Sequence, residues 1–337
     1  MTRFDLRPFI AGVRGIVASH ALGPPGAYRR WNWQDERKGR DLGLNPYGCA
    51  DAANLLYTIG DFPADSDERQ GWVRTLQGLQ EPETGFFREP THHEIHTTAH
   101  CIAALELFDA RPRHPIAGLA AYREPAAMVS FLEQLPWRND PWNASHRGAG
   151  LYVALVLTGA ADADWEDRYF AWLADETDPA TGFLRRGCVG PVDAGDVRSI
   201  FPHLAGTFHY LFNQEYARRP LAYPGAMAAT CLDLFARRAF PLGKWVGFAE
   251  IDWVYCLARS VRQCGQRFAE SRQALTEFAA GYLEFLAGLD PATHDGLNDL
   301  HALFGALCCL ADLQTALPGL IRTERPLRLV LDRRPFI

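Results

Sequence analysis

The chain has 337 residues, of which 48% are hydrophobic and 22% charged, and it carries a net charge of −6. These proportions are typical of globular proteins with a large core, and they exclude a largely disordered chain. The charges form no basic block, so we expect no binding to nucleic acid.

A short sequence motif, here called the repeated phrase, occurs three times along the chain. The copies run from Glu81 to Phe86, from Asp178 to Phe183 and from Asp290 to Gly296. Each copy follows an amphipathic stretch and precedes a second stretch that is richer in small and apolar residues. Because such internal repeats are typical of repeat architectures, we predict that each copy is a loop joining an outer helix to an inner one.

The predicted helices follow one another at near-equal spacing along the whole chain. Outer helices, with apolar residues on one side and charges on the other, are predicted at 8–20, 66–79, 124–135, 164–174, 224–238 and 270–286. Inner helices are predicted to begin near Gly48, His96, His146, His203, Glu250 and Asn298.

The composition of the inner helices indicates how the hairpins are arranged. Helical repeats form either an open solenoid or a closed ring. The inner segments are apolar nearly all round, as expected of helices that are buried on every side. The sequence therefore predicts an all-α fold, a closed (α/α)6 toroid that forms one domain over residues 1–337.

Localisation and cofactors are predicted from what the sequence lacks. Residues 1–7 have no apolar signal core, and the longest apolar run, 149–161, is too short to span a bilayer. The eight Cys form no CxxC pair and lie mostly within apolar helical patterns. We therefore expect a cytoplasmic protein with no membrane contact, no metal and no cofactor, and the oligomeric state stays open.

Polar residues gather at the predicted starts of the inner helices. Unpaired N–H groups and the positive end of the helix dipole stabilise carboxylates and anionic ligands there. Six helix starts are expected to direct these side chains into one central pocket. The residues are Asp51, His96, His100, Ser145, His146, Arg147, His203, His209, Glu250, Asp252, Asn298, Asp299 and His301.

Each of these acids also has a structural interpretation. Asp51, Asp252 and Asp299 are good N-cap residues, and a cap contributes about 0.5 to 2 kcal/mol. Glu250 and Asp252 are two residues apart and point about 200° away from each other on a helix, so both face the pocket only if the helix begins between them. One of these two is expected to be structural.

The densest polar segment is His92 to His100. His96 and His100 are four residues apart and share a helix face, as metal-ligand pairs do, but the HExxH pattern is not satisfied. We therefore interpret them as proton carriers or partners of a ligand hydroxyl. His92 and His93 are expected in a solvated loop.

Several aromatic residues adjoin the polar helix starts, among them Trp142, Trp253 and Tyr255. An aromatic ring beside a carboxylate is typical of sugar sites, while core packing is the alternative for each ring. Dinucleotide-binding, phosphate-binding and serine-hydrolase motifs are absent.

The chain resembles the α/α toroid proteins over nearly its whole length, through loose motifs. Gln80 to Phe86, followed by Thr97 to Leu105, is similar to the repeat of terpenoid cyclases and protein prenyltransferases. The segment Asp299 to His301 is similar to the one that supplies a zinc-binding His in the prenyltransferases. The acidic DxDD motif and the Asp-x-Cys zinc pair of those enzymes are missing.

The chain also resembles the six-hairpin carbohydrate enzymes, which include glycosidases, unsaturated-uronyl hydrolases, polysaccharide lyases and sugar epimerases. That resemblance implies a pocket lined with Asp, Glu, His and Trp. An isoprenoid pocket is mostly apolar, and the predicted one is wetter. A sugar substrate is favoured, with an isoprenoid enzyme and a noncatalytic toroid that binds a glycan or a partner as alternatives.

The working hypothesis is a hydrolase, with a lyase or epimerase as alternatives, that acts on an oligosaccharide or uronic-acid sugar. Asp51 and Asp252 are the proposed carboxylate pair, one protonated as general acid and the other activating water, and Glu250 and His96 are further catalytic candidates. The predicted substrate-binding residues are His100, His146, Trp142, His203, His209, Trp253, Tyr255, Asp299 and His301.

Overall fold

The computed structural model describes residues 4–34, 38–189, 200–239 and 242–337. These residues form helices and loops, apart from two strands of two residues each. The strands β1 (Phe4–Asp5) and β2 (Ile321–Arg322) pair in parallel and join the two ends of the chain. The predicted all-α class is therefore confirmed.

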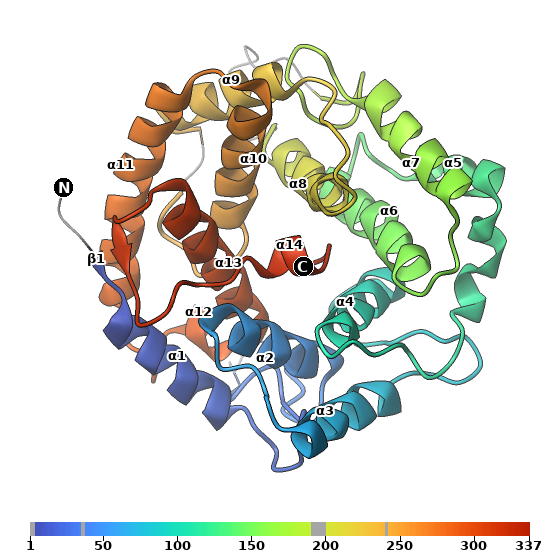
Figure 1. Ribbon diagram of the computed structural model, residues 1–337, viewed down its shortest axis with the longest axis vertical. Coiled ribbons are helices and arrows are strands. Elements are labelled where there is room, and N and C mark those ends of the chain that lie inside the picture. The colour runs from blue at the N-terminus through green and yellow to red at the C-terminus, as the bar shows by residue number, and fades with distance from the viewer. Residues whose placement is uncertain (1–3, 35–37, 190–199, 240–241) are drawn as a thin grey trace.

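Six helices surround the C-terminal segment (Figure 1). In chain order, each packs against the next, and the last, α13, packs against the first, α2. Their small and apolar residues are buried on nearly every side, as the sequence predicts. These inner helices are α2 (Pro46–Ile59), α4 (Glu94–Glu106), α6 (Pro141–Val156), α8 (Phe201–Tyr216), α10 (Ala249–Cys264) and α13 (Leu300–Ala316).

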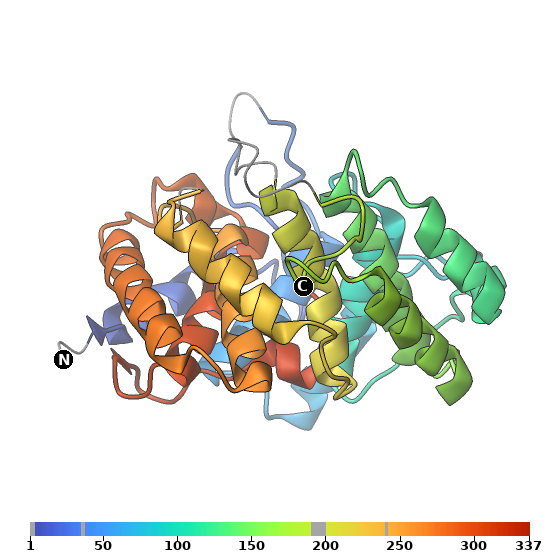
Figure 2. The ribbon, with the colours of Figure 1, turned by 90° about the horizontal axis from the view of Figure 1, so that it is seen from above.

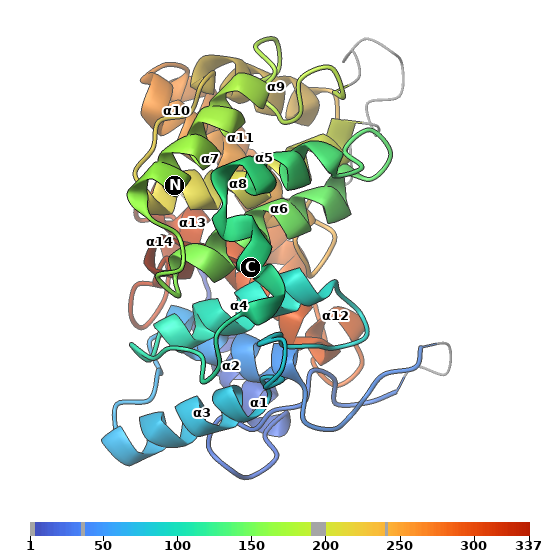
Figure 3. The ribbon, with the colours of Figure 1, turned by 90° about the vertical axis from the view of Figure 1, so that its right-hand side faces the viewer.

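A second set of helices lies outside the first (Figures 1, 2 and 3). Each of them has one buried face. These outer helices are α1 (Arg7–Ser19), α3 (Ser66–Gly78), α5 (Pro125–Gln134), α7 (Ala163–Glu176), α9 (Pro224–Ala236) and α11 (Phe268–Ala287). The remaining helices are short: η1 (Ala117–Arg123), α12 (Asp295–Asn298) and α14 (Val330–Arg333). None of the helices in the described ranges has the length and apolar character that crossing a bilayer requires.

The inner helices begin close to the predicted positions, with one clear error. Helix α6 begins at Pro141, five residues before the predicted start at His146, because Asp140 caps it and Pro141 fits the first helical position. Helix α13 begins at Leu300, because Asp299 is extended and its carboxylate accepts a bond from the backbone N–H of His301 (3.0 Å).

The first two copies of the repeated phrase form the same loop. In one, the N–H of Glu81 donates to the carbonyl of Phe86 and that of Gly85 donates to Glu81, both at 2.8 Å; Asp178, Gly182 and Phe183 repeat this pattern at the same distances. Gly85 has a φ of 77° and its Cα faces the carbonyl of Pro115, so a side chain there would clash. The predicted outer-to-inner loops are confirmed at both places.

The C-terminal segment, residues 330–337, lies at the centre of the inner helices and packs against α2 and α8. The Asn213 side chain donates to the carbonyl of Pro335 (3.1 Å), and the Phe336 ring packs against His96 and Phe212, with centroids 4.8 and 5.7 Å away. Arg334 is fully buried, and its guanidinium lies 5.1 Å from the Phe304 ring. This segment therefore fills part of the space that the inner helices enclose.

Candidate functional site

Six imidazoles form a continuous row along the inner helices, which we call the histidine arc. Neighbouring ring centroids are 4.4 Å apart for His209 and His146, 4.2 Å for His146 and His96, and 5.0 Å for His96 and His92. The row continues at 5.3 Å from His92 to His301 and at 5.3 Å from His301 to His100. His96 and His301 lie in the first turns of α4 and α13, His100 and His146 in the second turns of α4 and α6, and His209 farther along α8, while His92 precedes α4.

Asp51 lies at one end of the arc. It is fully buried in the second turn of α2, and its Oδ1 accepts from His100 Nε2 at 2.8 Å and from His301 Nδ1 at 3.2 Å. Burial works to raise the pKa of Asp51, but the facing imidazoles of His301 and His100 outweigh it and hold the pKa below its ordinary value. Asp51 is therefore an ionised carboxylate in a dry environment.

Tyr47 lies at the middle of the arc, one helical turn before Asp51. Its ring packs against His92, His100 and His301 with centroids 4.4, 4.8 and 4.6 Å away, and its hydroxyl bonds to His96 Nδ1. His96 and His100 both contact this ring, so the helix face that they share is the one directed inward.

The other end of the arc is held by Ser145. Its hydroxyl donates to the carbonyl of Trp142 (2.7 Å), so it accepts from His209 Nδ1 (2.8 Å). The Trp142 indole meets His146 and His209 edge-on at 5.6 and 5.7 Å. These contacts place the His209 proton on Nδ1 and leave Nε2 as an acceptor.

Burial keeps most imidazoles of the arc neutral. It lowers the pKa of His209 to about 3 and that of His100 to about 4, the latter although the Asp51 charge works in the opposite direction. Burial and the neighbouring imidazoles lower the pKa values of His96 and His146 well below the ordinary value. A neutral imidazole offers one donor and one acceptor, which is what a ligand hydroxyl requires.

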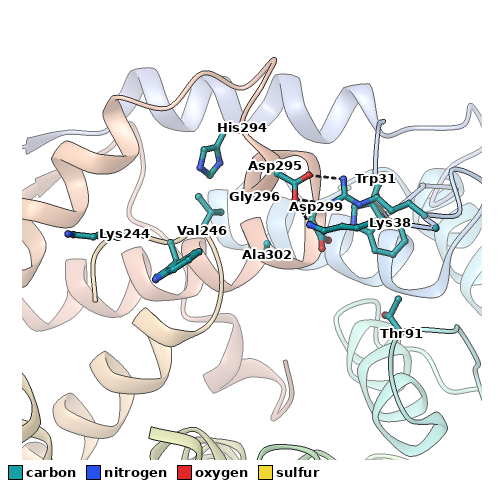
Figure 4. A pocket seen from close by; sticks show the side chains of 13 residues that line it. Trp31, Lys38, Thr91, Lys244, Val246, His294, Asp295, Gly296, Asp299 and Ala302 are labelled. Atoms are coloured by element: carbon teal, nitrogen blue, oxygen red, sulfur yellow. Dashed lines mark hydrogen bonds and ion pairs between the residues drawn. The ribbon is translucent and has the colours of Figure 1, made fainter. Parts of the chain in front are cut away.

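A solvent-accessible pocket of about 580 Å³ lies beside the arc (Figure 4). Its wall includes Asp299 and Thr91, which both bind the buried guanidinium of Arg30 at 2.8 Å. That guanidinium lies 5.2 Å from the centroid of the Tyr47 ring. Arg30 therefore connects the wall of this mouth pocket to the arc.

The mouth pocket combines cations with indole rings. Arg40 and Lys38 bind the carboxylate of Asp295 at 2.7 and 3.0 Å, and Trp31 lies beneath Arg30. Trp245 is 59% exposed at the rim. The remaining residues of the wall are Gly39, Lys244, Val246, His294, Gly296 and Ala302.

Glu250 and Asp252 lie in the first turn of α10, which begins at Ala249, before both of them. Glu250 Oε1 accepts from the N–H of Gly243 (3.0 Å), and burial raises its pKa to about 7.

Asp252 is fully buried, and neither carboxyl oxygen has a hydrogen-bond partner among the described residues. Burial and the charge of Glu250 raise the pKa of Asp252 well above its ordinary value. Glu250 is thus the structural member of the two, and Asp252 is a neutral acid.

Three predicted binding residues lie outside the arc. The Trp253 indole packs between the inner and outer helices, stacked on Phe235 (4.8 Å), and donates to the carbonyl of Cys231. Tyr255 packs against Phe208 and Arg259. His203 Nδ1 donates to the carbonyl of Leu184 (3.1 Å). The structure gives all three a packing or loop-holding role.

Sequence reasoning missed several members of the site. His92 was expected in a solvated loop, but its ring stacks on Tyr47; the signal was its spacing of four residues from His96 and eight from His100. Arg30 and Trp31 carried no signal, because they lie in a loop that pairs with Asp299 near the other end of the chain. Of the three acids considered as N-caps, Asp299 alone has that role; Asn45 caps α2 and Phe248 precedes α10.

Comparison of the chain with protein-family models, curated proteins and solved structures gives no match.

Proposed function

We propose that the chain is a closed toroid of six helical hairpins and that the protein is a carbohydrate-active enzyme working at the mouth of this toroid. The contact of α13 with α2, and the pairing of β1 with β2, support the closed arrangement. The catalytic proposal is carried by one observation: a row of imidazoles, most of them kept neutral by burial, ends at the ionised carboxylate of Asp51.

The ligand chemistry follows from the groups present. Neutral imidazoles match the hydroxyls of a polyol, because each supplies one donor and one acceptor. The exposed ring of Trp245 offers an apolar face to sugar C–H groups, and Lys244 suits the carboxylate of a uronic acid, whereas Lys38 and Arg40 already bind Asp295. A carbocation from an isoprenoid would meet too many polar groups here.

Hydrolysis is the reaction we propose, with lyase and epimerase chemistry as alternatives. Acid/base work requires two groups whose environments push their pKa values apart. The pKa of Asp51 is lowered, so the Asp51 end of the arc is where water would be activated. Asp252, whose pKa is raised, stays the candidate acid that the sequence suggested, although it is not among the residues that line the mouth pocket. This division of roles keeps the pair that the sequence suggested.

We also propose that the protein works in a reducing compartment such as the cytoplasm. All eight cysteines are free, and six of them are buried in the packing. Disulfides form and persist in oxidising compartments and are rare in the cytosol. The free thiols support the assignment.

A panel of neutral and uronate-containing oligosaccharides tests the proposal. Binding is measured by calorimetry and products by mass spectrometry: addition of water indicates hydrolysis, an unsaturated uronate indicates a lyase, and an isomer of unchanged mass indicates an epimerase. We expect Trp245→Ala to weaken sugar binding about 10-fold, equivalent to about 1.4 kcal/mol.

Phe268→Ala is the matched control, because Phe268 is 58% exposed, begins α11 and is not among the residues that line the mouth pocket. It should leave sugar binding unchanged. If no sugar of the panel binds to the wild-type protein, or if both variants lose binding equally, the assignment to carbohydrate chemistry is wrong.

A further inference from the structure

We infer that Asp51, His100 and His301 form a binding site for a divalent transition-metal ion, with Zn²⁺ as the best match. The three residues lie on α2, α4 and α13, and α2 packs against both of the other helices. The site therefore joins inner helices from early and late parts of the chain. On the sequence we expected no metal and interpreted His96 and His100 as proton carriers; the structure groups His100 with Asp51 and His301 instead.

The ligand atoms already face one another. One oxygen of Asp51 and one nitrogen of each imidazole lie within 4.8 Å of one another, with Asp51 Oδ1 2.8 Å from His100 Nε2 and 3.2 Å from His301 Nδ1. Ligand atoms of a tetrahedral zinc site are about 3.4 Å apart, given bonds of about 2.1 Å. A small shift of each side chain would make room for the ion.

The unsatisfied atoms of the cluster point to a ligand. Asp51 Oδ2 and His100 Nδ1 are buried and have no hydrogen-bond partner within the described part of the chain. A buried carboxylate oxygen that lacks such a partner is unfavourable unless a positive charge compensates it. A metal ion would provide this charge and would accept a second bond from the carboxylate.

The chemistry of the three ligand groups also suits a transition metal. Two nitrogens and one oxygen are a ligand set of catalytic zinc sites, in which a fourth position is left for water or substrate.

The Tyr47 ring would hold both imidazole ligands in place. It stacks on His100 with centroids 4.8 Å apart and meets His301 edge-on at 4.6 Å. Both rings are thereby fixed in the orientation that directs a nitrogen to Asp51. Such support from outside the ligand set is typical of metal sites.

Metal binding is measured on the full chain after removal of metals with a chelator. We expect one Zn²⁺ per chain by elemental analysis and calorimetry at pH 7.5, and strong visible absorption after loading with Co²⁺, as a low-symmetry site of few ligands produces. His301→Ala should weaken Zn²⁺ binding by more than about 100-fold, beyond the loss expected from an outer-shell change.

His209→Ala is the matched control, because His209 belongs to the opposite end of the arc and should leave metal affinity unchanged. Circular dichroism checks that each variant is folded; if His301→Ala is not, His301→Gln and the Co²⁺ spectrum of the wild-type protein decide. Absence of Zn²⁺ binding to the wild-type protein, or binding that folded His301 and His100 variants retain, overturns the site and leaves a cluster in which Asp51 is hydrogen-bonded to two imidazoles.

This inference does not depend on the proposed function. A protein that binds Zn²⁺ at these residues but no sugar refutes the carbohydrate assignment alone. A protein that binds sugar but no Zn²⁺ refutes the metal site alone.

Discussion

Asp252 combines complete burial with two carboxyl oxygens that lack a hydrogen-bond partner among the described residues. Its pKa is raised, so the folded state must keep a proton that the unfolded chain loses above about pH 3.9, the ordinary value for Asp. The stability that this group contributes is therefore lost as pH rises. Each pH unit of this difference is worth about 1.4 kcal/mol.

We predict that Asp252→Asn raises the free energy of unfolding at pH 7.5 by about 1 kcal/mol or more, because Asn is neutral at every pH. If Asp252 is the general acid, turnover of the sugar substrate falls by about 10² to 10⁴ in the same variant. Urea unfolding and a steady-state assay measure the two effects. Asp164→Asn, at an exposed position of α7, is the control. If the Asp252→Asn protein is folded and retains full turnover, Asp252 is a purely structural residue.

For single residues, the sequence predicted which side chains lie near one another. It predicted less well which atoms they contact. Spacing of four residues placed His96 and His100 on one inward face of α4, and both contact Tyr47. Partners on other helices could not be predicted, because the bonds of Asp51 to His301 and of Arg30 to Asp299 join residues more than 240 positions apart. For the same reason, the helix start alone did not reveal that Trp253 points away from the arc.

Among the elements, the C-terminal segment was the least predictable. Helix spacing located the inner and outer helices to within a few residues, because apolar periodicity is a local property. Residues 330–337 have no such pattern, and their position at the centre of the inner helices follows from contacts with residues that are distant in sequence, on α2, α4, α8 and α13.

We predict that Phe336→Ala destabilises the protein by about 3 kcal/mol or more, the cost typical of removing a buried Phe ring. The ring is 1% exposed and packs on His96 and Phe212, so the variant leaves a cavity beside the arc. Urea unfolding measures the loss, and Phe268→Ala, at an exposed position, should change stability by less than about 0.5 kcal/mol. Equal effects of the two substitutions would show that the segment contributes little to stability.

For the whole molecule, the arc predicts sensitivity to acid. The pKa values of His96, His100, His146 and His209 are lowered in the folded state, whereas in the unfolded chain they lie near 6.5. Below pH 6.5 the unfolded chain therefore binds protons that the folded protein does not, and stability falls as pH falls.

We expect the free energy of unfolding to decrease from pH 6.5 to about pH 4, where His100 becomes protonated in the folded state, by up to about 1.4 kcal/mol per pH unit for each imidazole. Urea unfolding at several pH values measures the slope. His209→Gln should reduce the slope of the free energy of unfolding against pH by the equivalent of about one bound proton. His114→Gln, outside the arc, should leave this slope unaltered. A free energy of unfolding that stays constant or rises as the pH is lowered toward 5 would contradict this prediction.

The contact between α2 and α13 has a consequence for synthesis on the ribosome. Asp51 leaves the ribosome about 250 residues before His301, so its carboxylate lacks this partner until those residues have been translated, although His100 follows it by only 49 positions. Bringing such distant segments together is entropically unfavourable and slow. The inner faces of the hairpins that are translated first therefore stay partly exposed until the last hairpin is made. The protein is expected to depend on chaperones during this interval.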